Sequence, residues 1–114
     1  MSILAQYENA WIRAAEGDLS GIENLYDTDF SGFSHSSRRE INKDDVLKTA
    51  DLFKGATVEK FRIIFENEDF ACIQHNISMH EVEQRSAGDY SILVAITLKN
   101  GTIVSQETGM TKLG

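Results

Sequence analysis

The sequence lacks several features that would otherwise define its class. A single cysteine, Cys72, excludes an internal disulfide and offers no pair of thiolates for a metal centre. The longest apolar run, Ile92 to Ile96, is far shorter than the about 20 residues of a membrane-spanning helix. The first residues, MSILAQYENAW, carry no basic segment before a long apolar stretch, so no secretory signal is expected. We therefore expect a cytoplasmic protein without a membrane partner.

Basic residues are also few. Eleven Lys and Arg stand against 18 Asp and Glu, which gives a net charge of −7, and Arg38-Arg39 is the only adjacent basic pair. This charge repels phosphate backbones, so no nucleic-acid partner is expected. The 114 residues are 41% hydrophobic and 25% charged, which are ordinary globular values. The length predicts a single domain that spans residues 1–114.

The first half of the chain has helical periodicity. A stripe of apolar residues recurs at spacings of three and four, which predicts a first helix that Gly17 ends in the left-handed conformation. Asp18 can cap a second, short helix. After a predicted short strand and the polar loop within FSGFSHSSRRE, Asn42 opens a third helix with Asp45 in the capping-box position, and Gly55 ends it. The stripe of the first helix consists of Ile3, Leu4, Tyr7, Trp11, Ala14 and Ala15.

From Thr57 onward the hydrophobic period becomes two, which is typical of strands. The segments ENED, SAGD and Asn100-Gly101 separate four strands, and Asn-Gly is the strongest signal for a two-residue hairpin. YSILVAITL is apolar on both sides, so its second face should be covered by another segment or by a partner subunit. The fold class is therefore α+β, with helices packed on one face of a curved antiparallel sheet. The mouth of the resulting cone is a natural place for a small ligand.

Two of the three histidines lie in one predicted strand, CIQHNISMHEVE. Residues 75 and 80 have opposite parity and point to opposite faces of the sheet, so they cannot share a metal ion, and no metal or cofactor is expected. His75 shares its face with apolar residues that point toward the helices. A core histidine with a hydrogen-bond partner and a pocket-lining base are the two interpretations of this placement. His80 shares its face with polar residues and is expected in solvent or at an interface.

The last strand offers His75 a possible partner. If Ile103 points inward, Glu107 does too, and burial would raise the pKa of its carboxyl so that it could act as an acid near neutral pH. The opposite face, with Gln106 and Met110, is an almost equally good inward face, and the sequence leaves this open. Tyr7 is the third candidate catalytic group, because it lies on the buried stripe of the first helix. His35 and Arg39 lie in the polar loop, either at a cavity rim or simply in solvent. The candidate pocket residues are Trp11, Phe33, His35, Phe61, Phe65, Ile77 and Met79.

Three segments together resemble one superfamily over nearly the whole chain. The opening amphipathic helix, AAEGDLSGIENLYDTDF and LKNGTIVSQETG look like the nuclear transport factor 2-like superfamily, especially its SnoaL-like and ketosteroid-isomerase-like members. The resemblance implies a cone-shaped α+β barrel of the cystatin-like kind, an apolar pocket and a homodimer through the outer sheet face. The isomerase-like pattern would place a catalytic carboxylate just past the first strand, but residues 34–37 are Ser-His-Ser-Ser. The epoxide-hydrolase pattern needs an Asp-Arg-Asp set in one cavity, and Arg62 lies on the opposite side from Phe61.

Three functions remain open at this level, because one fold carries many activities. The first is a pocket protein that binds a small, largely apolar molecule. The second is a small isomerase, cyclase or hydrolase-like enzyme that uses cofactor-independent acid/base chemistry with His75, assisted by Glu107 and Tyr7. The third is a homo-oligomeric assembly module.

Overall fold

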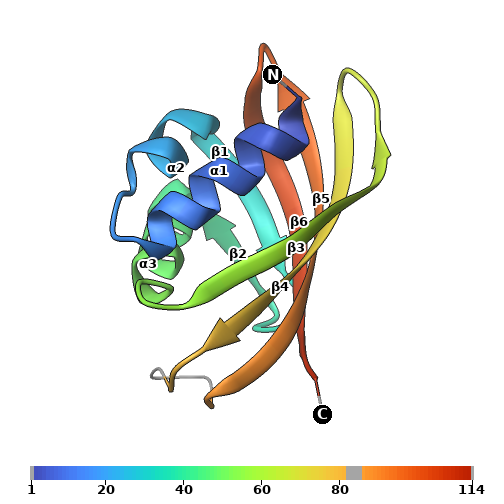
Figure 1. Ribbon diagram of the computed structural model, residues 1–114. Helices are drawn as coiled ribbons and strands as arrows, with labels where there is room; N and C mark the ends of the chain where they lie inside the picture. The colour runs from blue at the N-terminus through green and yellow to red at the C-terminus, as the bar shows by residue number, and fades with distance from the viewer. Residues whose placement is uncertain (1, 82–85, 114) are drawn as a thin grey trace.

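The computed structural model describes residues 2–81 and 86–113. Two helices, α1 and α2, come first, and a third, α3, lies between the strands β2 and β3. The helices gather on one side of a strongly curved sheet (Figure 1). None of the helices in the described part of the chain is long and apolar enough to cross a membrane. The elements are α1 (Ile3–Ala15), α2 (Ser20–Leu25), β1 (Tyr26–Ser34), β2 (Arg39–Asn42), α3 (Lys43–Leu52), β3 (Thr57–Glu66), β4 (Phe70–Met79), β5 (Gly88–Lys99) and β6 (Thr102–Lys112).

The six strands form one sheet in the order β2-β1-β6-β5-β4-β3. The four consecutive strands β3 to β6 pair antiparallel, as predicted. The expected antiparallel sheet holds for these four strands, but β1 runs parallel to β6. The partner of β1 lies about 75 positions further along the chain, and no local pattern reveals such a pairing. The sheet is therefore mixed, and the fold class is α+β as expected.

The segment predicted as a polar loop contains a further strand. Residues 39–42 form β2, which pairs antiparallel with the end of β1. Arg38, with a φ of 57°, lies in the connecting turn. Two hydrogen bonds fasten this turn to β6, since the Met110 N–H donates to the Ser36 side-chain Oγ at 2.8 Å and the His35 N–H donates to the Thr108 carbonyl at 2.8 Å. The β1–β2 turn thus has a fixed position against β6.

The helix ends follow local chemistry. Gly17 adopts a φ of +99° after α1, and Asn42 and Asp45 form a complete capping box at the start of α3, both as predicted. Helix α3 ends at Leu52, before the expected stop at Gly55. Because each of these two caps satisfies backbone groups locally, the end of α1 and the start of α3 could be predicted without tertiary contacts.

The core lies between the helices and the concave face of the sheet. The Asn100-Gly101 hairpin has the predicted positive φ values of 54° and 80°, and it fixes how β5 faces β6. Tyr26 and Gln106 make a buried hydrogen bond, in which the hydroxyl donates to the amide oxygen at 2.8 Å. The largest fully buried side chains are Tyr7, Tyr26, Ile22, Ile73, Ile77, Ile96, Ile103, His75 and Val94.

Irregular pairings decide which side chains face this core. In β6, Ser105 pairs with Thr97 but Ile103 pairs with Leu98, so one extra residue enters the strand. Ile103 is therefore buried, and after the irregularity Gln106 is buried instead of residue 105 or 107. An extra residue of this kind shifts every later side chain to the opposite face.

Candidate functional site

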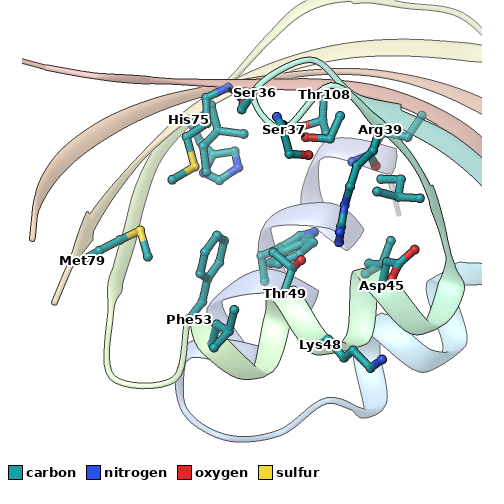
Figure 2. A pocket seen from close by; sticks show the side chains of 18 of the residues that line it. Ser36, Ser37, Arg39, Asp45, Lys48, Thr49, Phe53, His75, Met79 and Thr108 are labelled. Atoms are coloured by element: carbon teal, nitrogen blue, oxygen red, sulfur yellow. Dashed lines mark hydrogen bonds between the residues drawn. The ribbon is translucent and has the colours of Figure 1, made fainter. Parts of the chain in front are cut away.

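A cavity of about 310 Å³ opens between the helical layer and the sheet. Figure 2 shows the side chains that point into it from α3, from the β1–β2 turn and from the strands. Its volume is at the lower end of the range for small-ligand pockets, which fits a compact ligand. The lining residues are Tyr7, Trp11, Ser34, Ser36, Ser37, Arg39, Ile41, Asp45, Val46, Lys48, Thr49, Leu52, Phe53, His75, Met79, Ile92, Gln106, Thr108 and Met110.

His75 lies in the wall of this cavity. The parity prediction is confirmed, since His75 is 1% exposed on β4 while His80 is exposed. Its ring stacks on Phe61, with centroids 4.3 Å apart and planes at 11°, and it meets the edge of Tyr7 at 6.0 Å. Nδ1 is buried without a hydrogen-bond partner among the described residues. Burial lowers the pKa of His75 from 6.5 to about 4, so the ring is neutral at pH 7.

A cluster of hydroxyl, indole and amide groups lies beside His75. The Tyr26 hydroxyl donates to Gln106 and has Tyr7 and Trp11 as its other polar neighbours. The Trp11 N–H, although close, does not reach hydrogen-bond geometry. Burial raises the pKa of Tyr7 well above its usual value and also raises that of Tyr26. Neither hydroxyl ionises near neutral pH, so both act only as hydrogen-bonding groups.

Glu107 does not join His75. Its side chain is 61% exposed on the outer face of the sheet, where His35 Nε2 lies 2.7 Å from its Oε1. The expected meeting of Glu107, His75 and Tyr7 in one cavity is therefore wrong. The cause is the irregularity in β6, which leaves Ile103 inside but turns Glu107 outward. The alternative inward face that the sequence left open, with Gln106 and Met110, lines the cavity.

Five of the seven candidate pocket residues do not line the cavity as expected. The rings of Phe33 and His35 meet edge to face, with centroids 4.8 Å apart, and His35 lies beside Glu107 outside the cone. Phe65 is 53% exposed, because an irregularity between Ile63 and Phe65 reverses its direction on β3. Phe61 and Ile77 pack in the core without lining the cavity, while Trp11 and Met79 line it.

Several lining residues were missed at the level of sequence. They come from α3, which supplies Asp45, Lys48 and Thr49, and from the serines of the β1–β2 turn. The serine-rich segment was visible in the sequence, but only the pairing of β2 brings it to face the helix. Within residues 2–81 and 86–113, no three His, Cys, Asp or Glu side chains gather where they could hold a metal ion.

Comparison with known proteins identifies the fold. No family model and no curated protein sequence matches the chain. An NTF2-like protein of unknown function from Burkholderia xenovorans has a TM-score of 0.70 at 17% identity, over 97% of this chain and 84% of its own. A protein with a ketosteroid isomerase-like fold from Catenulispora acidiphila, solved with trimethylamine, has a TM-score of 0.69 at 11% identity, over 95% and 85%. IdmH from Streptomyces antibioticus, described as a proposed polyketide cyclase, has a TM-score of 0.68 at 13% identity, over 96% and 92%.

These neighbours show that the chain has the nuclear transport factor 2-like fold, which confirms the resemblance seen in the sequence. At identities of 11% to 17% the likeness extends to the fold alone. The activity has to be argued from the cavity itself.

Proposed function

We propose that the protein binds a small, largely apolar molecule in the cavity between α1, α3 and the sheet. The observation that carries this proposal is the cavity of about 310 Å³ itself, with Trp11, Phe53, Met79 and Ile92 in its walls. Apolar walls with a few convergent polar groups are typical of small-molecule sites. The neutral His75 ring and the Gln106 amide supply such polar groups without bringing a charge into the interior.

Acid/base catalysis by His75 has less support. A pKa of about 4 makes its ring a weak base at pH 7. Among the described residues that line the cavity, Asp45 is the one carboxylate, and its Oδ2 already accepts the Asn42 N–H at 2.9 Å. Glu107, the carboxylate expected to assist, faces the other side of the sheet. A binding protein is therefore the better account of this site.

The test uses Trp11 as its reporter, because it is the only tryptophan and it lines the cavity. We expect 1-octanol and octanamide to change its fluorescence saturably and to raise the unfolding temperature. Thr108→Phe places a ring in the cavity and should weaken binding by about tenfold or more. Thr111→Phe, on an exposed position of the same strand, is the matched control. A response that does not saturate, or equal losses in the two variants, would contradict the proposal.

We also propose that a second copy of the chain covers the outer face of the sheet. Phe65, Cys72 and Ala95 pair across three strands there, and Leu93 in the neighbouring row is 48% exposed. Covering these exposed apolar side chains is favourable. Light scattering across concentration should find a dimer that Leu93→Lys weakens and that Leu113→Lys, a control at another exposed leucine, leaves intact. A monomer at all concentrations would refute the dimer and leave the binding proposal untouched.

A further inference from the structure

The mouth of the cavity differs in charge from the rest of the molecule. The chain carries a net charge of −7, yet the charged residues that line the cavity are Arg39, Lys48 and Asp45. Two cations therefore stand against one anion. Arg39 belongs to β2 and Lys48 to α3, so the positive groups lie on two elements that face each other across the opening.

Arg39 extends over the cavity instead of away from it. In Figure 2 its side chain runs from β2 toward α3, and its guanidinium end lies in the space between Thr49 and Asp45. Asp45 is bound to the start of α3 through the Asn42 N–H and makes no ion pair with Arg39. The guanidinium end therefore lies near an acidic group without forming an ion pair with it.

Two other cations, Arg13 and Lys43, have carboxylate partners. Arg13 lies 3.8 Å from Asp18, and Lys43 lies 3.2 Å from Glu23. Within the described part of the chain, Arg39 has no such ion pair and no side-chain hydrogen bond. A guanidinium offers five N–H donors in a planar fork that matches a carboxylate. Its donors are therefore available at the point where the polar end of a ligand would emerge.

The hydroxyl groups nearby complete a polar rim. Ser37 and Thr49 line the same opening as Arg39, while Trp11, Phe53 and Met79 line the apolar part. A ligand that fills both regions has an apolar body and one hydrogen-bonding, negatively charged end. A cationic end would meet the like charge of Arg39 at this opening.

We propose that the ligand is a small amphipathic carboxylate, whose apolar body enters the cavity while its carboxylate binds the Arg39 guanidinium at the mouth. This inference rests on the proposed binding function and names its ligand class. Charge-assisted hydrogen bonds are stronger than neutral ones. Because Arg39 is exposed, solvent weakens this bond and limits the gain in affinity. The preference for the charged ligand should therefore be about tenfold.

The experiment compares octanoate with octanamide, which has the same chain and a neutral end. Binding of each is titrated at pH 7 through Trp11 fluorescence and calorimetry. We expect the wild-type protein to bind octanoate about tenfold more tightly than octanamide, and added salt to reduce this preference. Arg39→Gln should abolish the preference by weakening octanoate alone. Arg38→Gln removes the same charge from a residue that does not line the cavity, and it should keep the preference.

The outcomes distinguish a failure of the carboxylate assignment from a failure of the proposed binding function. Equal affinity of the wild-type protein for both ligands, or equal effects of Arg38→Gln and Arg39→Gln, would overturn the carboxylate assignment while apolar binding stands. If neither octanoate, octanamide nor 1-octanol binds, the proposed function and the ligand class both fail.

Discussion

The buried ring of His75 predicts a specific dependence of stability on pH. In the unfolded chain its pKa is the ordinary 6.5, and in the folded protein burial lowers it to about 4. Above pH 6.5 both states hold a neutral ring, and below about pH 4 both hold a protonated one. Between these values the unfolded chain binds a proton that the folded protein does not. The free energy of unfolding therefore falls as the pH falls through this window.

The size of the effect follows from the pKa difference. One pKa unit corresponds to about 1.4 kcal/mol, so the free energy of unfolding changes by about 3 kcal/mol across the full window. This loss is a large fraction of the about 5–15 kcal/mol that stabilises an ordinary domain. Carboxylates also titrate near the lower end of the window, so the contribution of His75 has to be isolated by substitution.

The assay is urea unfolding at a series of pH values across that window, followed by Trp11 fluorescence. His75→Gln cannot titrate, so the variant should lose about 3 kcal/mol of the pH dependence. Any cost of burying the new amide appears at every pH and does not change the slope. His80→Gln, at an exposed position of the same chain segment, should retain the wild-type slope. The reasoning is refuted if His75→Gln and the wild-type protein show the same slope.

Three further substitutions test the fold around the site. Asn42→Ala removes half of the capping box of α3 and should lower the free energy of unfolding by about 1 kcal/mol in urea, and no loss would contradict the role of the cap. Tyr26→Phe leaves the buried Gln106 oxygen without its donor and should lower the free energy of unfolding in urea by about 1–3 kcal/mol. An unchanged free energy would show that the hydrogen bond does not stabilise the fold. Gly32→Ala puts a methyl group against the Gln106 carbonyl and 2.9 Å from the Phe30 ring. The midpoint of thermal unfolding should therefore fall. An unchanged midpoint would mean that β1 and β6 separate easily.

Local chemistry determined much of this protein by sequence alone. The helical stripe of α1, the stop at Gly17 and the capping box at Asn42 depend on residues within a few positions of one another. The positive φ values of the Asn100-Gly101 hairpin are equally local. The inward direction of His75 followed from alternation, because β4 keeps a regular register with β5 from Phe70 to Met79.

Tertiary structure decided the rest of the site. Single extra residues in β3 and β6 turned the side chains of Phe65 and Glu107 to the outer face of the sheet. No residue type in the sequence predicts such an irregularity. The parallel pairing of β1 with β6 and the short strand β2 then brought Arg39 opposite α3. These pairings join segments far apart in the chain, so their energies depend on the whole sheet. The sequence by itself thus determined the elements and the face of His75, while long-range strand register decided which side chains share the cavity.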